Sequence, residues 1–246
     1  MEHRAGILPA LEYPGRLILV GAGPDRDTAR IVYAITGRSA SSQARKLVYC
    51  EHGIWVEPTD QETLKKGNVD LLVYPAVLFD AAGAAVSNGR QTAEIRSRLG
   101  LERTGGPVSV LAEALEKWDF EPDAPIFTPR ISGCVCGGRA GLSLIRRGTK
   151  GESLRSYFDF PLEPGSGRLV STYQGPNRDP LPCFEGEPLV TGFPALTARE
   201  TAEAIYEDLA PAAGAKDFRV AVASVTVPVE APGAGDVYII NRHERI

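Results

Sequence analysis

Two apolar runs decide the fold: Arg16-Leu17-Ile18-Leu19-Val20 and Thr28-Ala29-Arg30-Ile31-Val32-Tyr33-Ala34-Ile35-Thr36. Both are rich in β-branched and aliphatic residues and are therefore predicted to be strands. The turn between them, Gly21-Ala22-Gly23-Pro24-Asp25-Arg26, partly matches a dinucleotide-binding fingerprint. However, Arg26 stands where the third glycine belongs, and no helical pattern follows it. The two runs therefore predict an antiparallel hairpin and argue against a Rossmann fold.

The remaining predicted elements fall into groups along the chain. Apolar runs bounded by glycines and charged residues predict strands over residues 46–50, 54–57, 71–79, 84–87, 131–135, 142–146, 156–160, 168–173, 218–227 and 237–240. Helical periodicity predicts helices over 93–99 and 108–118, and a capping box at Thr197 and Glu200 predicts a third helix to about residue 209. Strands, then helices, then strands again predict an α+β domain whose antiparallel sheets are covered by helices.

The composition predicts one domain over residues 1–246, because no repeat or low-complexity tract separates the halves. The formal net charge of −4 argues against binding to nucleic acid, which needs a basic surface. The first residues lack the pattern of a signal peptide, and no run of about 18 apolar residues occurs. We therefore expect a cytoplasmic protein without a membrane partner, and the sequence leaves a homo-oligomer open.

The four cysteines do not form the pattern of a disulfide framework in a chain of this length. Cys134 and Cys136 are two positions apart on a predicted strand, so their side chains should share one face. The Cys-x-Cys spacing is unusual for a zinc site, and none of the histidines falls in a ligand-spaced pair. We therefore expect reduced thiols, no metal and no cofactor.

A polar loop lies between the second predicted helix and the strand over 131–135. It runs from Asp119-Phe120-Glu121-Pro122 to Thr128-Pro129-Arg130-Ile131. Proline fixes its own φ and restricts the residue before it, so the prolines hold Glu121 and Thr128 in extended geometry. Acid, hydroxyl and guanidinium groups on such a stiff loop indicate a ligand site; the alternative is a solvated connection.

The segment Val86-Ser87-Asn88-Gly89-Arg90-Gln91-Thr92 joins a predicted strand to a predicted helix. Its backbone N–H groups and Arg90 are suited to meet an anion such as phosphate at a helix N-terminus. The alternative is that Asn88-Gly89 forms only a tight turn and that Thr92 is only an N-cap.

Three further polar positions are candidate site residues. Arg38 lies among the hydroxyls of Thr36-Gly37-Arg38-Ser39-Ala40-Ser41-Ser42, and its guanidinium suits a phosphate or a polarised carbonyl oxygen. Tyr74 precedes Pro75 in an apolar run, where a phenol can donate a hydrogen bond or act as a weak acid. Glu185 lies on a long loop rich in proline and glycine. The alternatives are a solvated serine loop, a packed tyrosine and an irregular surface connection.

Taken in order, these segments resemble the archaeal-type IMP cyclohydrolase family over residues 13 to about 192. The resemblance is carried by Tyr13-Pro14-Gly15-Arg16, Gly37-Arg38-Ser39, Tyr74, Val86-Ser87-Asn88-Gly89 with Thr92, Thr128-Pro129-Arg130-Ile131, and Ser171-Thr172-Tyr173 with Pro182 to Gly186. It implies a four-layer αββα sandwich similar to the N-terminal-nucleophile hydrolases but without their self-processing, in agreement with Glu2 at the second position. It also implies closure of 5-formamidoimidazole-4-carboxamide ribonucleotide to inosine monophosphate (IMP) with loss of water.

Arg38, Tyr74 and Glu121 are expected to be the catalytic residues of such a reaction. The purine nucleotide substrate is expected to contact Ser39, Asn88, Gly89, Arg90, Thr92, Thr128, Arg130 and Glu185. The chain departs from the family in two places. It has Pro75-Ala76 where archaeal members carry a polar or thiol pair, and it has a run of serines after Arg38. Two alternatives stay open: a nucleotide-binding homologue without turnover, and an amide-bond hydrolase on the same fold. The hydrolase is disfavoured because the sequence offers no N-terminal nucleophile and no cysteine with a nearby histidine.

Overall fold

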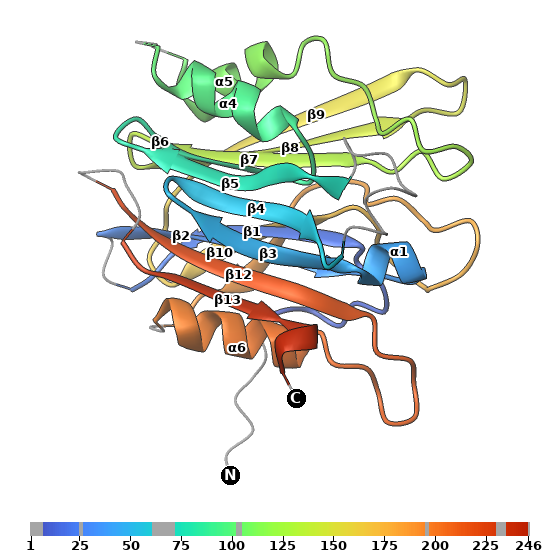
Figure 1. Cartoon of the computed structure of the whole chain (residues 1–246). Coiled ribbons are helices and arrows are strands. Elements are labelled where there is room, and N and C mark those ends of the chain that lie inside the picture. The colour runs from blue at the N-terminus through green and yellow to red at the C-terminus, as the bar shows by residue number, and fades with distance from the viewer. Residues whose placement is uncertain are drawn as a thin grey trace.

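The computed structural model describes residues 7–24, 27–60, 72–101, 105–194, 197–229 and 235–245, and these residues form two antiparallel sheets (Figure 1). The six-stranded sheet has the order β11 (Leu189–Gly192), β10 (Ser166–Ser171), β1 (Arg16–Ala22), β2 (Thr28–Thr36), β12 (Arg219–Pro228) and β13 (Val237–Asn241). The seven-stranded sheet has the order β3 (Arg45–Cys50), β4 (Gly53–Pro58), β5 (Tyr74–Asp80), β6 (Gly83–Ser87), β7 (Arg130–Cys136), β8 (Arg139–Arg147) and β9 (Ser153–Pro161). The helices are α1 (Ala40–Gln43), α4 (Gln91–Leu99), α5 (Gly106–Ala114), α6 (Ala198–Asp208) and the 3-10 helix η1 (Arg242–Glu244).

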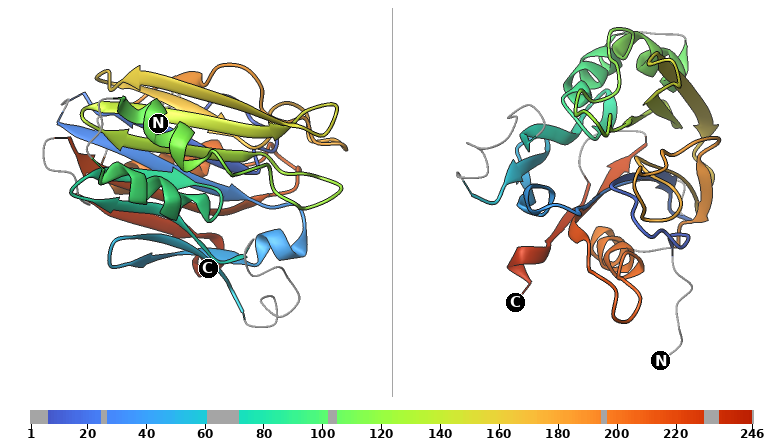
Figure 2. Two further views of the ribbon diagram at one scale, coloured as in Figure 1. Left: turned by 90° about the horizontal axis from the view of Figure 1, so that it is seen from above. Right: turned by 90° about the vertical axis from the view of Figure 1, so that its right-hand side faces the viewer.

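The two sheets stack face to face between outer helices (Figures 1 and 2). Helices α4 and α5 cover the outer face of the seven-stranded sheet, and α6 covers the outer face of the six-stranded sheet. The core between the sheets is made of fully buried side chains from both, among them Ile18, Tyr33, Val77 and Leu142. The prediction of an α+β fold with helices over antiparallel sheets is confirmed. The likeness to N-terminal-nucleophile hydrolases stays a prediction.

The hairpin predicted from the first two apolar runs is present, with the pairing running from Arg16 opposite Ile35 to Ala22 opposite Ala29. Alternate side chains of β1 pack into two different hydrophobic cores. Leu17 and Leu19 pack on the α6 side, whereas Ile18 and Val20 face the other sheet. Because both faces of the strand are covered, its sequence is continuously apolar and does not alternate.

Several element boundaries differ from the sequence prediction. Helix α4 begins at Gln91 and not at residue 93, and α5 ends at Ala114, with Leu115 as its C-cap, and not at residue 118. The predicted strands are found with ends shifted by up to three residues; residue 71 lies outside the described part. The elements α1, β11 and η1 were missed, since elements of three or four residues carry too little periodicity to detect.

Asn241 ties the edges of the two sheets together. Its Oδ1 accepts a hydrogen bond from the Leu47 N–H at 2.8 Å, and its Nδ2 donates to the Leu47 carbonyl at 3.0 Å. Asn241 lies at the end of β13, and Leu47 lies on the edge strand β3 of the other sheet. The side-chain amide thus pairs with β3 as a neighbouring strand would. It fixes where β3 lies over the six-stranded sheet.

We expect Asn241→Ala to lower the free energy of unfolding by about 2 kcal/mol, because it leaves the Leu47 N–H and carbonyl without partners. Urea denaturation of the purified variant measures this. The exposed Cys50, which lies on β3 with Leu47, provides the control. Cys50→Ala should change the free energy of unfolding by less than about 0.5 kcal/mol. Equal effects of the two substitutions would show that Asn241 does not join the sheets.

Candidate functional site

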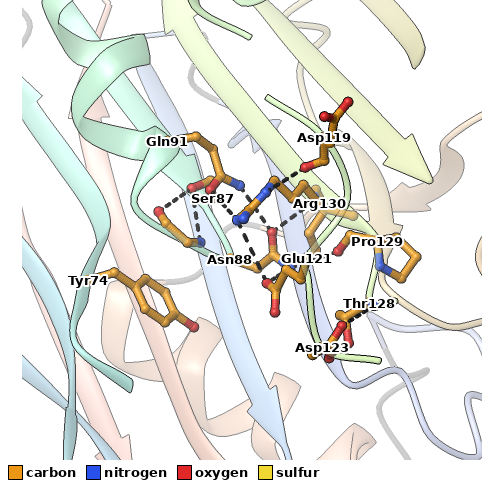
Figure 3. A network of polar contacts seen from close by, with 12 residues as sticks. Tyr74, Ser87, Asn88, Gln91, Asp119, Glu121, Asp123, Thr128, Pro129 and Arg130 are labelled. Atoms are coloured by element: carbon orange, nitrogen blue, oxygen red, sulfur yellow. Dashed lines mark hydrogen bonds and ion pairs between the residues drawn. The ribbon is translucent and has the colours of Figure 1, made fainter. Parts of the chain in front are cut away.

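Most of the predicted site residues gather at one end of the sandwich. Because neighbouring strands are antiparallel, strand starts and strand ends alternate along each edge. Tyr74 starts β5, Ser87 ends β6, Arg130 starts β7, and Arg16, which starts β1 in the other sheet, lies against Tyr74. The loop between α5 and β7 folds over this end and supplies Glu121. Figure 3 shows the resulting polar network.

The side-chain amide of Asn88 is the centre of this network. Its Nδ2 donates to Glu121 Oε1 at 3.2 Å and to the Pro129 carbonyl at 2.9 Å. Its Oδ1 accepts from the Ile131 N–H at 2.9 Å and from Gln91 Nε2 at 3.2 Å. Asn88 is 2% exposed, and these four bonds use its full capacity. The amide therefore has one orientation, with its donor side toward Glu121.

Arg130 braces the loop that carries Glu121. Its Nε donates to the Asp119 carbonyl at 2.7 Å, and its Nη1 donates to Gln91 Oε1 at 3.1 Å. Nη1 also lies 4.0 Å from Glu121 Oε1, and the guanidinium stacks over the Trp118 ring at 4.9 Å. Burial lowers the pKa of Arg130, and the charge of Glu121 opposes this effect. Arg130, which follows the loop at the start of β7, thus binds the beginning of the loop and helix α4.

The loop itself is stiffened by Thr128. The Glu121 N–H donates to the Thr128 carbonyl at 2.9 Å, which closes the loop on itself. The Thr128 N–H and hydroxyl donate to the two Asp123 carboxylate oxygens at 2.7 and 2.5 Å. The hydroxyl also lies 2.9 Å from the Tyr173 hydroxyl. Thr128 therefore serves the conformation of the loop and connects it to the segment that follows β10.

Glu121 is an unusual carboxyl because it is only 7% exposed. Burial raises its pKa to about 7, and the neighbouring Arg16 and Arg130 only partly offset that rise. A carboxyl with this pKa exchanges its proton near neutral pH, as a general acid or base must. The geometry and the electrostatics thus point to the same residue.

Tyr74 packs in the core between the sheets and is 1% exposed, and its hydroxyl points toward the side of the network on which Glu121 lies (Figure 3). Its hydroxyl is 2.9 Å from the Tyr33 hydroxyl. Burial and the proximity of Tyr74 raise the pKa of Tyr33, although Arg16 partly opposes this. For Arg16, burial disfavours the charged form, but Tyr74, Tyr33 and Glu121 outweigh burial and raise its pKa. Arg16 therefore supplies a fixed positive charge beside the Tyr74 hydroxyl.

Arg16 and Tyr33 were not predicted as site residues. Arg16 lies in one of the segments that carry the family resemblance, and a cation at the start of an apolar strand was a usable signal. Tyr33 gave no signal, because a tyrosine in an apolar run is usually a packed side chain.

Pro75 does not disturb the position of Tyr74. A proline inside a sheet removes a backbone donor and is found at edges or bulges. The pairing of β4 with β5 shifts its register between Ile54 and Trp55, next to Pro75. This irregularity accommodates the proline, so the departure at Pro75-Ala76 leaves the tyrosine in place.

The turn after β6 uses its hydroxyls internally. Ser87 Oγ and Thr92 Oγ1 are 2.5 Å apart, so one hydroxyl donates to the other, and the Gly89 carbonyl lies 2.8 Å from Ser87 Oγ and 3.0 Å from Thr92 Oγ1. The N-cap of α4 is Arg90, which is exposed and makes no side-chain cap, so Thr92 is not the N-cap. A Cβ at Gly89 would lie 2.7 Å from Arg130 Nη1, which explains the glycine.

Three predicted residues lie apart from the Glu121 network. Arg38 donates to Asn177 Oδ1 at 3.2 Å and to Asp179 Oδ1 at 2.8 Å, and stacks over Tyr13 at 5.3 Å. Ser39 caps α1 by accepting a hydrogen bond from the Ser42 N–H. Glu185 is exposed and forms an ion pair with Arg146 at 3.1 Å. Tyr13 stacks on Tyr173, so Arg38 belongs to the rim of the same end.

The cysteines take no part in this network. Cys134 and Cys136 share the face of β7 that lies beneath the helices, as predicted from their spacing. In the described residues, no three His, Cys, Asp or Glu side chains gather in a way that could hold a metal ion. None of the described helices is both long and apolar enough to cross a bilayer.

A cavity of about 620 Å³ lies close to the rim but outside this network. Its lining includes Pro14, Thr36, Asn177, Lys216 and Phe218, and neither Glu121 nor Tyr74. We place the candidate site at Glu121, because a buried carboxyl with a raised pKa lies there close to the charges of Arg16 and Arg130.

The comparisons with known proteins identify the family of the chain. Residues 13–230 match the model of the IMP cyclohydrolase-like protein family, and the chain belongs to that family. A comparison with curated proteins gave no match. The matched range contains every residue of the network described above.

We expect Glu121→Gln to become more stabilising as the pH rises. The folded protein binds a proton at Glu121 up to about pH 7, whereas the unfolded chain releases it near its ordinary pKa of 4.5. The stability from Glu121 is therefore complete below the unfolded pKa and is lost as the pH rises through the folded pKa. Because Gln does not titrate, the free energy of unfolding of the variant relative to wild type should rise by roughly 3 kcal/mol across this window.

Urea denaturation at a series of pH values measures this difference. The exposed Glu187 provides the control, and Glu187→Gln should show little change with pH. A flat difference for Glu121→Gln between about pH 4.5 and pH 8 would contradict the raised pKa.

Proposed function

We propose that the protein closes 5-formamidoimidazole-4-carboxamide ribonucleotide to IMP with loss of water. The observation that carries this proposal is the buried Glu121 carboxyl, whose pKa of about 7 lets it accept and return a proton near neutral pH. Membership of the IMP cyclohydrolase-like family supports the same reaction.

The substrate supplies both reacting groups. The carboxamide nitrogen is a weak nucleophile, but it adds to the formyl carbon of the same molecule, so a site that holds the planar conformer lowers the barrier. As the C–N bond forms, the carboxamide nitrogen loses a proton and the formyl oxygen gains one, which gives a hydroxyl. The formamide nitrogen then loses its proton, the ring C=N bond forms, and the hydroxyl takes up a proton and leaves as water.

Each step has a candidate group in the network. Glu121 takes the carboxamide proton as a general base and returns a proton to the departing hydroxyl as a general acid. Tyr74 donates a hydrogen bond to the formyl oxygen, and the charge of Arg16 stabilises the negative charge that develops there. Asn88 positions Glu121, while Thr128 and Arg130 hold the loop.

The assignment of Arg38 to the formyl oxygen is a separate hypothesis. In the described residues, the hydrogen bonds of its guanidinium go to Asn177 and Asp179, on the loop that follows β10. Arg16, in contrast, already lies against Tyr74. We therefore assign the polarising role to Arg16. To Arg38 we assign a role in holding the substrate at the rim.

A nucleotide-binding homologue without turnover is the second candidate, because Pro75-Ala76 replaces the polar or thiol pair of archaeal members. The two functions share a binding site and differ in the use of Glu121. An absorbance assay of ring closure, with calorimetry of IMP binding, separates them. IMP binding without ring closure would favour the homologue.

Glu121→Gln should lower kcat for ring closure by roughly a hundredfold or more, because the amide keeps the shape and the hydrogen bond from Asn88 but does not carry the proton. The affinity for IMP should stay unchanged, and the limb of the pH–rate profile near pH 7 should disappear. The control is Glu187→Gln, which should behave as wild type. If the Gln variant loses affinity and keeps kcat, Glu121 is part of the scaffold.

Lysine substitutions should distinguish the roles of Arg16 and Arg38. Arg16→Lys keeps the charge but loses the planar fork, so kcat should fall by roughly tenfold to a thousandfold. Arg38→Lys should mainly raise KM, because Arg38 lies at the rim and its hydrogen bonds go to Asn177 and Asp179. Steady-state kinetics of both variants at saturating substrate provide the test. A larger loss of kcat in Arg38→Lys would return the polarising role to Arg38.

A further inference from the structure

Strand β9 leaves a long edge of the seven-stranded sheet open. It ends the strand order of that sheet, and in the described residues it pairs only with β8. The other sheet edges are shorter or covered. Strands β11 and β13 have four and five residues, and Asn241 occupies the Leu47 N–H and carbonyl on the edge of β3. An open strand edge of nine residues is suited to pair with another chain.

The hydrogen bonds of the β8–β9 hairpin show which backbone groups face outward. The Gly148 N–H donates to the Glu152 carbonyl at 2.7 Å, so this pair is of the hydrogen-bonded type, and the type alternates along an antiparallel ladder. The backbone groups of the even-numbered residues of β9 therefore face β8, and those of the odd-numbered residues point away from the sheet. In agreement, the carbonyl of Ser153 accepts a hydrogen bond from Arg155 Nη1 at 3.4 Å.

The charges on the odd-numbered positions are self-complementary about Tyr157. Arg155 lies two residues before Tyr157, and Asp159 lies two residues after it. In an antiparallel pair of two β9 strands centred on Tyr157, each Arg155 stands opposite Asp159 of the second copy. Opposite charges at directly opposed positions stabilise a strand pair, whereas like charges destabilise it. A two-fold contact of this kind uses the same surface of both copies, as in most homo-oligomers.

We propose that two copies of the chain form a dimer by antiparallel pairing of their β9 strands about Tyr157. The seven-stranded sheets of the two copies then join into one continuous sheet. Arg155 and Asp159 are both exposed, and within the chain they pair with Asp119 and Arg139, so the dimer adds a second partner to each. This inference is independent of the proposed reaction.

Apolar side chains at the same edge of the sandwich support a contact there. Strands β9 and β11 lie on one side, because Arg168 of β10 stacks over Phe160 of β9 at 5.8 Å while Asn241 joins the opposite edges. Leu154 on β9 is exposed, and Val190 on β11 is 69% exposed. In the proposed pair, Leu154 stands opposite Phe160 of the second copy, which removes apolar surface from water.

Sedimentation velocity over a range of protein concentrations tests the dimer. A contact of one strand pair and its neighbours is small, so we expect wild type to change from monomer to dimer at roughly micromolar concentrations. Arg155→Glu places two acids opposite each other, and Asp159→Lys places two bases opposite each other. Each variant should therefore dimerise roughly tenfold or more weakly. A wild type that stays monomeric up to about 100 μM would overturn the proposal.

The double variant Arg155→Glu with Asp159→Lys separates the contact between copies from local effects. It restores opposite charges across the two-fold contact, so its dimer affinity should return toward that of wild type. Within one chain, the same changes put like charges beside Asp119 and Arg139, so local damage would add up in the double variant. A double variant that dimerises as weakly as the single variants would overturn the pairing, as would a dimer that neither single change affects.

Arg199→Glu provides a matched control on the exposed face of α6. It changes the net charge by the same amount as Arg155→Glu, and it should leave the dimer affinity unchanged. A loss as large as that in Arg155→Glu would show a general effect of charge and would overturn the assignment to β9.

A disulfide at position 157 tests the register of the pair. When two strands are centred on Tyr157, its two Cα atoms lie about 5.5 Å apart, which is within the range that a disulfide spans. Tyr157→Cys in a Cys50→Ala background should form a covalent dimer on mild oxidation, seen on a non-reducing gel. Ser153→Cys in the same background should not, because its two copies lie eight residues apart along the paired strands. A dimer without the cross-link at position 157, or with equal cross-linking at both positions, would overturn the pairing about Tyr157.

Discussion

The candidate site depends on the burial of the Glu121 carboxyl next to the side-chain amide of Asn88, whose orientation is fixed by its hydrogen bonds. Asn88 accepts the Ile131 N–H through Oδ1, and this bond to the backbone leaves Nδ2 facing Glu121. Burial favours the neutral acid and dominates the balance, whereas the charges of Arg16 and Arg130 favour the carboxylate. The result is a carboxyl that carries a proton near neutral pH while held at a fixed place. The proposed roles of Tyr74 and Arg16 depend on this carboxyl.

The antiparallel sandwich explains how residues so distant in the sequence reach this carboxyl. Strand ends of the two stacked sheets meet at one end of the molecule, so Arg16 and Tyr33 of one sheet contact Tyr74 of the other. Asn241 ties the outer edges of the same sheets and sets the position of β3. The packing of the sheets therefore determines the spacing of the groups in the candidate site.

Local signals made the main elements predictable from the sequence. The apolar hairpin, the Thr197 and Glu200 capping box and the stiff loop around Glu121 depend on neighbours in the chain, and each is present. Arg16 and Tyr33 escaped prediction because their chemistry arises from contacts between the sheets. Likewise, the sequence suggested Thr92 as an N-cap, but Ser87 lies close enough in space to bind its hydroxyl. Pairing across sheets leaves no pattern in a single sequence.

Direct titration of the Glu121 carboxyl tests the account most closely. Carbon-13 NMR of protein labelled at the glutamate side-chain carboxyl follows its ionisation, and the resonance that is missing in Glu121→Gln assigns the signal. The account predicts a midpoint near the pKa of about 7 that burial produces. A midpoint close to the ordinary glutamate value of 4.5 would show that Glu121 is ionised throughout the neutral range and does not carry the proton.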